Sequence, residues 1–181
     1  MQYESRTMGM WRSLSTALAA GFLVAACGSS SASPTAPADQ ASASGFSAAD
    51  LCALVTPAEV SAALGNAVAA GVPSGVNAPS CTWQGSTGTG ASLTIAATSP
   101  DSVGQLPFGL QNVPSPRLTA VSGIGDAAFF ASGATGATAE FDVRKGNRAV
   151  TITVGSTDPN YTQQQQEAAE QAVGAAAAAR M

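Results

Sequence analysis

The clearest structural signal in the chain is AEFDVRKGNRAVTITV, residues 139–154. Apolar and polar residues alternate on both sides of Gly146-Asn147, a pattern typical of two β-strands joined by a short turn. The predicted hairpin pairs three apolar positions: Val143 with Val150, Phe141 with Ile152 and Ala139 with Val154. The other face then carries Glu140, Asp142, Thr151 and Thr153. A shift by one residue would mix the two faces, so the pattern specifies the register.

Shorter signals on either side of this hairpin predict the rest of a sheet. Residues 91–98 alternate between apolar and polar side chains, as in a half-buried strand, and residues 81–84 form a shorter strand before them. Residues 121–131 are a glycine turn that runs into an apolar strand. Residues 101–110 favour a short helix only weakly, because they contain two glycines and a proline, and 111–118 are a proline-rich loop.

Two longer segments have helical features. Residues 48–64 carry apolar residues at helical spacing, and Thr56-Pro57-Ala58-Glu59 is a capping box from which the helix restarts. A closing helix is expected from Asp158-Pro159 to about Arg180, with an alanine-rich contact face: Ala168, Ala169, Ala172, Val173 and Ala176. These elements together predict an α+β fold, a small single domain with helices packed on an antiparallel sheet, over residues 46–181.

Composition excludes several classes of function. The 181 residues include no histidine, which removes the commonest general base near neutral pH and all histidine metal sites. Charged residues make up 10% and the formal net charge is −4, so the chain lacks the basic surface that nucleic-acid binding requires. We expect no cofactor, no metal site and no catalysis. The alternative is an envelope enzyme or an accessory subunit of an envelope enzyme or transport complex, which would need carboxylates with perturbed pKa values in a cleft.

The first 45 residues have the composition of an export signal and a tether. Arg6 and Arg12 precede an apolar run of about 13 residues, too short to span a bilayer, and the run ends at Leu23-Val24-Ala25-Ala26-Cys27. This end resembles the lipobox of bacterial lipoproteins, which implies removal of residues 1–26 and a diacylglycerol on Cys27. The start could equally be Met8 or Met10. Residues 27–45 are rich in Ser, Ala and Pro and predict a disordered tether.

Three cysteines are present, so lipid on Cys27 would leave Cys52 and Cys81 as an even pair in an exported chain. Disulfides persist in such compartments, and we expect these two residues to form one. The alternative is two buried free thiols.

Several of these features occur together in one family. The lipobox and tether, LCALVTPAEV at 51–60, CTW at 81–83, GIGDAAF at 123–129, the last strand pair and the alanine-rich helix are similar to the actinobacterial lipoproteins grouped as domain of unknown function 3558. The resemblance covers the mature chain and departs most at 100–118. It implies a small α+β domain with one disulfide on a lipid anchor, and it implies no activity.

Candidate sites outside the cysteines are few. Arg144, Lys145 and Arg148 at the predicted hairpin tip are candidates for contact with an anionic surface, although the simpler interpretation is a solvated turn whose charges oppose aggregation. Acidic residues at 101, 140, 142 and 158 lack the spacing of a calcium loop. We therefore expect a non-catalytic, ligand- or partner-binding lipoprotein on the outer face of the cell membrane, whose ligand or protein partner the sequence does not identify.

Overall fold

A computed structural model describes residues 45–75, 78–86, 90–133 and 139–181. The predictions for residues 1–44, which include the signal segment and Cys27, lie outside the described residues. The domain is α+β, with three α-helices and a seven-stranded sheet. The helices are α1 (Ala48–Ala53), α2 (Pro57–Leu64) and α3 (Gln163–Arg180), and two short 3-10 turns are η1 (Pro100–Ser102) and η2 (Phe108–Leu110). No helix among these residues is long and apolar enough to cross a membrane.

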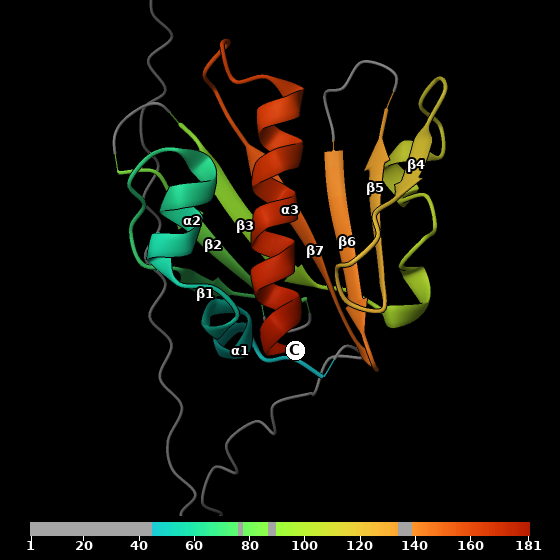
Figure 1. Cartoon of the computed structure of the whole chain (residues 1–181), viewed down its shortest axis with the longest axis horizontal. Helices are drawn as coiled ribbons and strands as arrows, with labels where there is room; N and C mark the ends of the chain where they lie inside the picture. Colours follow the sequence, from blue (N-terminus) through green and yellow to red (C-terminus); the bar gives the residue numbers. More distant parts are fainter. Residues whose placement is uncertain (1–44, 76–77, 87–89, 134–138) are drawn as a thin grey trace, which may run out of the picture. The chain divides into compact units, whose positions relative to one another are not determined.

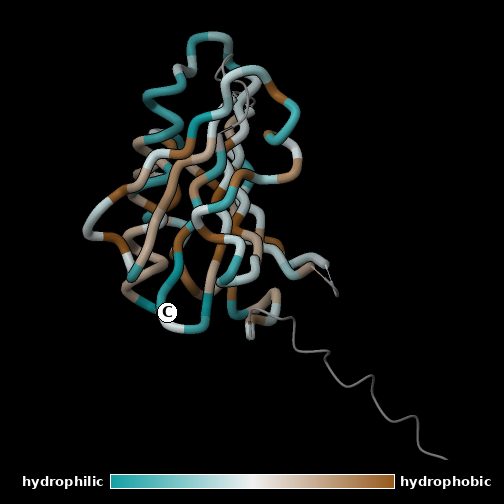
Figure 2. Tube along the Cα trace, turned by 90° about the vertical axis from the view of Figure 1, so that its right-hand side faces the viewer, coloured by the Kyte–Doolittle hydropathy of each residue, from teal (hydrophilic) through white to brown (hydrophobic). Residues whose placement is uncertain are grey.

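Every neighbouring pair of strands in the sheet is antiparallel, in the order β1-β2-β3-β7-β6-β5-β4. The strands are β1 (Val72–Ser74), β2 (Ser80–Gln84), β3 (Ser92–Ala97), β4 (Arg117–Ala120), β5 (Ala127–Ser132), β6 (Ala139–Lys145) and β7 (Arg148–Gly155). Figure 2 shows hydrophobic and hydrophilic residues interspersed along the chain trace.

The predicted hairpin register is confirmed. Phe141 pairs with Ile152 and Val143 with Val150. The ladder between β6 and β7 begins at Phe141, so the predicted pair of Ala139 with Val154 lies outside it. All four of these paired side chains are fully buried. The alternation predicted from the sequence therefore places the apolar set in the core.

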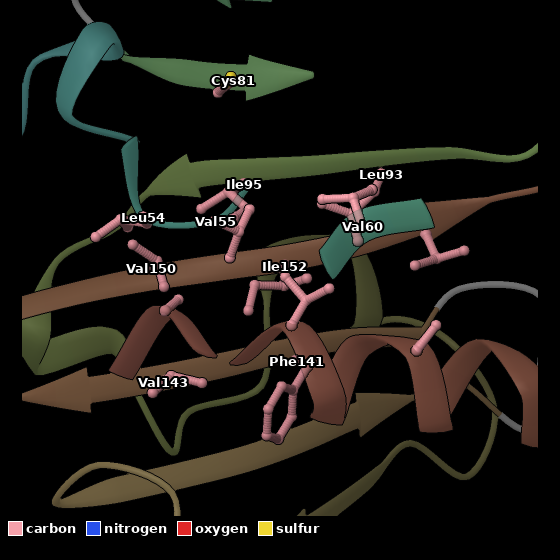
Figure 3. Packing of buried hydrophobic residues seen from close by; sticks show 14 of the residues in the cluster. Leu54, Val55, Val60, Cys81, Leu93, Ile95, Phe141, Val143, Val150 and Ile152 are labelled. Carbon is pink, nitrogen blue, oxygen red and sulfur yellow. The ribbon is translucent and has the colours of Figure 1, made fainter. Parts of the chain in front are cut away.

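All three helices cover one face of the sheet. α1 contacts β1, β2 and β3, α3 contacts β6 and β7, and α2 packs against α3 (Figure 1). Figure 3 shows the aliphatic and aromatic side chains that fill the space between these layers, among them Val60, Leu93, Ile95 and Phe141. The main core thus lies between the helices and one face of the sheet. Leu110, Ala131 and Ala149 are buried outside this main cluster, and the other face of the sheet carries most of the polar side chains.

Both first helices begin as capping boxes. The Ser47 hydroxyl accepts the N–H of Asp50, and the Thr56 hydroxyl accepts the N–H of Glu59. Gly65, with φ of 70°, ends α2 in the left-handed conformation that favours glycine. The helix restart predicted at Thr56 is confirmed.

The C-terminal helix begins later than predicted. The Asp158 side chain accepts N–H groups of Asn160 in a local turn, and α3 starts only after Thr162, whose hydroxyl accepts the N–H of Gln165. Its buried face is also rotated from the predicted one and comprises Ala169, Glu170, Val173, Gly174, Ala177 and Ala178. Ala168 and Ala172 are exposed. An alanine-rich sequence carries almost no periodic signal, and a polar residue, Glu170, lies on the buried face, so the alanines alone could not define it.

The remaining differences lie at the edges of the sheet. The sequence indicated no strand at β1, and β4 begins within residues 111–118, which were predicted as loop. The short helix expected at 101–110 is instead η1 and η2 with turns between them. Every residue of β1 and β4 is exposed, so neither strand shows the alternation of a half-buried strand.

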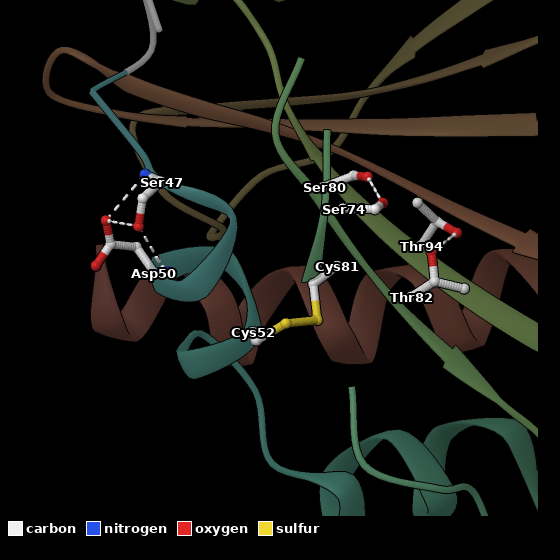
Figure 4. Close-up of a disulfide and its surroundings, with 8 residues drawn as sticks. All are labelled: Ser47, Asp50, Cys52, Ser74, Ser80, Cys81, Thr82 and Thr94. Carbon is white, nitrogen blue, oxygen red and sulfur yellow. Dashed lines mark hydrogen bonds between the residues drawn. A yellow bond between two sulfur atoms is a disulfide. The ribbon is translucent and has the colours of Figure 1, made fainter. Parts of the chain in front are cut away.

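The Cys52–Cys81 disulfide is present and joins α1 to β2 (Figure 4). Cys81 is fully buried, and Trp83, two residues along the same strand, is 1% exposed. A Cβ on Gly71 would lie 2.6 Å from the Cys81 Sγ and 2.7 Å from the Trp83 ring, so the bridge and the indole lie on one side of β2 against a bare stretch of backbone.

Candidate functional site

The sheet face opposite the helices, here called the polar face, carries hydroxyl and carboxyl groups. It is formed by the side chains that alternate with the core residues, such as Thr82 and Thr94, which pair across β2 and β3 and share a hydrogen bond of 3.0 Å (Figure 4). Asp142 of β6 and Thr151 of β7 pair in the same way, and the Thr151 hydroxyl donates to Asp142 Oδ1 at 2.6 Å.

A pocket of about 270 Å³ opens on the polar face over β6 and β7. Its floor is Glu140, Asp142 and Thr151, and its wall comes from the segment that follows β3. The wall residues are Thr98, Ser102, Gln105, Leu106, Pro107, Phe108 and Gln111. This volume lies just below the range of pockets that hold drug-sized ligands, so it suits a small molecule or a single side chain.

Local hydrogen bonds hold the wall in place. The Ser99 hydroxyl caps η1, and the hydroxyl groups of Thr98 and Ser102 lie 3.0 Å apart. The side-chain amides of Gln105 and Gln111 donate to backbone oxygens of this segment, at 2.7 Å and 3.2 Å. One amide N–H of each glutamine is thus used within the wall, whereas their side-chain oxygens have no hydrogen bond among the described residues.

Two carboxyl groups share the floor of the pocket. Glu140 and Asp142 are two residues apart on β6 and therefore point to the same face. Burial raises the pKa of Glu140, and the Asp142 charge raises it further. Burial also raises the pKa of Asp142, against the hydrogen bond from Thr151 that lowers it.

The two floor carboxyls lack a positively charged partner. Within the described part of the chain the one ion pair joins Arg180 to Glu59, far along the sequence from either residue, and no lysine or arginine lines the pocket. Asp142 is only 5% exposed, and its Oδ1 accepts the hydrogen bond from Thr151. The pocket therefore concentrates negative charge that the protein leaves uncompensated.

The rim of the pocket carries an exposed aromatic ring. Phe108 is 83% exposed, the most exposed large hydrophobic residue in the described part of the chain. An apolar ring in this position has no role in the core. The ring offers its aromatic face to a ligand, and the carboxyls below it offer negative charge.

The four acidic positions considered from the sequence are not brought together. Glu140 and Asp142 line the pocket. Asp158 lies in the turn before α3, and Asp101 lies in η1, where its backbone oxygen accepts a hydrogen bond from Gln105. In the described ranges no group of three or more acidic or cysteine side chains could hold a metal ion.

Two of the three basic residues of the hairpin tip have partners within the chain. Lys145 donates to the Ala178 oxygen at 2.8 Å near the end of α3, and the Arg148 guanidinium lies 4.7 Å over the Phe46 ring. Arg144 is half-buried. Contact of these three residues with an anionic surface stays a prediction, and two of them would have to leave structural contacts to make it.

Sequence reasoning missed the wall of the pocket. Phe108, Gln105 and Gln111 lie in the segment for which the sequence predicted no firm structure, and no spacing links them to Glu140 and Asp142. The signal that could have found the floor was the pair of acidic residues on the polar face of the predicted hairpin.

Comparison with known proteins adds nothing to this geometry, because no protein-family model, curated protein or solved structure matches the chain.

Proposed function

We propose that this chain is a non-catalytic binding module of the cell envelope, held on the outer face of the membrane by a lipid on Cys27. The lipobox-like end of the leader and the Ser/Ala/Pro tether support the anchor. The resemblance to domain of unknown function 3558 supports the same assignment. The disulfide is consistent with it, because such bonds persist in oxidising compartments.

The observation that carries the binding function is the pocket on the polar face. A buried carboxylate without a charge partner is costly, and a chain with so few charged residues has placed two of them together at the floor of a cavity. A ligand that compensates this charge would offset that cost.

Native mass spectrometry of the protein extracted gently from its own membrane tests both parts. We expect a chain that starts at Cys27, carries a diacylglycerol and retains the disulfide. The control, Cys27→Ser, should lack the lipid and leave the membrane fraction. A wild-type chain with residues 1–26 attached, or with a free Cys27 thiol, would contradict the anchor.

The same spectra test the pocket. A ligand that travels with the wild-type protein should be lost from Asp142→Asn and retained by Glu167→Gln, a change on the helix side of the sheet. Retention of the ligand by both variants would place the binding site elsewhere.

A second candidate, an envelope enzyme, is favoured by one specific observation: two carboxyl groups with raised pKa values share a pocket, as acid–base catalysis requires. An enzyme and a binding module predict different fates for the co-purified ligand. An enzyme would convert the co-purified ligand over time in a manner that Asp142→Asn abolishes, whereas a binding module returns it unchanged.

A further inference from the structure

The free polar atoms of the pocket are mostly hydrogen-bond acceptors. Asp142 Oδ2 and the Glu140 carboxyl face it without an ion-pair partner among the described residues. Gln105 and Gln111 each use one amide N–H on a backbone oxygen, and their side-chain oxygens remain as acceptors. A complementary ligand must therefore supply several donors from one small group.

Charge selects the same kind of group. The two floor carboxyls repel each other, because the Asp142 charge raises the pKa of Glu140. No lysine or arginine side chain lines the cavity. A ligand with a positive charge relieves this repulsion, whereas a neutral polyol does not and an anion would increase it. The exposed Phe108 ring at the rim attracts cations through its face.

Size and coordination argue against a metal ion. Ca²⁺ takes six to eight oxygen ligands, and the described residues hold no group of three or more carboxylates. The pocket of about 270 Å³ has room for more than a bare ion. An ammonium group on a short carbon chain fits both the volume and the acceptors.

We propose that the pocket binds an organic cation, with a primary ammonium group held by Glu140 and Asp142 and its carbon chain against Phe108. This assignment rests on the proposed binding function of the same pocket. An ammonium brings three N–H donors and one positive charge to a floor that offers acceptors and two negative groups. The amine could belong to a free small molecule or to a lysine side chain of a peptide.

Isothermal titration calorimetry of the full-length chain tests the assignment with four probes. n-Butylammonium and Nα-acetyl-lysinamide carry the group, 1-butanol is the neutral match, and CaCl₂ tests a metal. We expect both amines to bind and 1-butanol and Ca²⁺ not to bind. Tighter binding of the lysinamide would point to a peptide, and equal binding to a free amine.

Three variants localise the binding. Glu140→Gln and Asp142→Asn should each weaken n-butylammonium at least tenfold, and Phe108→Ala several-fold. Glu167→Gln removes the same charge on the other side of the sheet and should leave the affinity unchanged. Phe108 is exposed and Glu140 partly so, and thermal unfolding of each variant confirms that it is folded.

Each other outcome overturns the assignment. Amine binding that persists in Glu140→Gln and Asp142→Asn would show that the amine binds elsewhere. Ca²⁺ binding that those variants abolish would show that the pocket binds a metal ion and not an organic cation. If the amines do not bind but a co-purified neutral ligand is lost from Asp142→Asn, the assignment of an organic cation is wrong. The proposal that the pocket binds a ligand would still be supported. If no ligand of any kind depends on Asp142, the binding function falls as well.

Discussion

Glu170 places an acid inside the core between α3 and β7. Its side chain is fully buried, and Oε1 accepts the N–H of Val154 at 2.9 Å and the amide of Gln166 at 3.3 Å. Oε2 has no hydrogen-bond partner among the described residues. Burial raises the pKa of Glu170 to about 8, so the carboxyl group is protonated at neutral pH.

This raised pKa makes stability depend on pH. Between pH 4.5, the ordinary pKa of the group, and about pH 8, the Glu170 carboxyl is deprotonated in the unfolded chain and protonated in the folded chain. The free energy of unfolding therefore falls as pH rises through that window, by an amount on the order of 5 kcal/mol, and is constant again above it.

Glu170→Gln should remove this loss. A glutamine keeps an acceptor for the Val154 N–H and never ionises, so we expect the variant to match the wild type near pH 5 and to be the more stable at pH 8. Urea unfolding at pH 5, 6, 7 and 8 measures it. Asp101→Asn, at an exposed acid in η1, should keep the wild-type slope. Equal slopes for wild type and Glu170→Gln would show that the buried group does not titrate in this range.

At the scale of elements, what the sequence predicted well is local. The hairpin register follows from alternation between residues 141 and 152, and the start of α2 follows from the Thr56 hydroxyl three residues before an acid. β4 could not be predicted, because an exposed edge strand needs no apolar alternation and is held by backbone pairing with β5 alone. The start of α3 was wrong by about four residues, since Asp158-Pro159 and Thr162 both resemble a helix start.

The contact of α3 with β6 depends on a residue without a side chain. A Cβ on Gly174 would lie 2.4 Å from Cε1 of Phe141, whose ring is buried and packs 4.5 Å from that of Phe130. The bare helix surface at this point allows α3 to approach the sheet closely. Glycine is retained there although alanine favours helices by about 1 kcal/mol.

Gly174→Ala should therefore destabilise the domain by about 1–3 kcal/mol, because the overpacking outweighs the gain in helix propensity. Urea unfolding measures the change. Ala172→Leu, on the exposed side of the same helix, enlarges a side chain without a core contact and should change the stability by less than about 0.5 kcal/mol. A Gly174→Ala variant that is more stable than the wild type would contradict the close approach.

At the scale of the whole molecule, the candidate site joins parts of the chain that the sequence cannot bring together. Its floor is on β6 and β7 and its wall is the segment around η1 and η2, about 30 residues earlier. The acidic floor followed from the hairpin pattern, but the wall depends on tertiary packing of turns that have no period. The sequence could thus predict the acidic floor of the pocket but not its wall.

The disulfide and one arginine hold the helical layer together. The bridge fixes α1 to β2, and Arg180 at the end of α3 donates to the Leu54 oxygen and to Glu59, both at 2.8 Å. Both links converge on α1 and α2. Because these short helices have few residues of their own in the core, they depend on the links more than α3 does.

Removing the bridge should therefore destabilise the domain strongly. The disulfide closes a loop of about 30 residues, for which chain entropy predicts roughly 3 to 4 kcal/mol. We expect the double variant Cys52→Ala/Cys81→Ala to lose that amount in urea unfolding, and the wild type to unfold at lower temperature with a reductant present. A further Cys27→Ser change in the wild type should leave the response to reductant unaltered, because the bridge does not involve that thiol. A loss below about 1 kcal/mol would mean that Arg180 and the core suffice to hold α1 and α2, and the domain would then not need an oxidising compartment to fold.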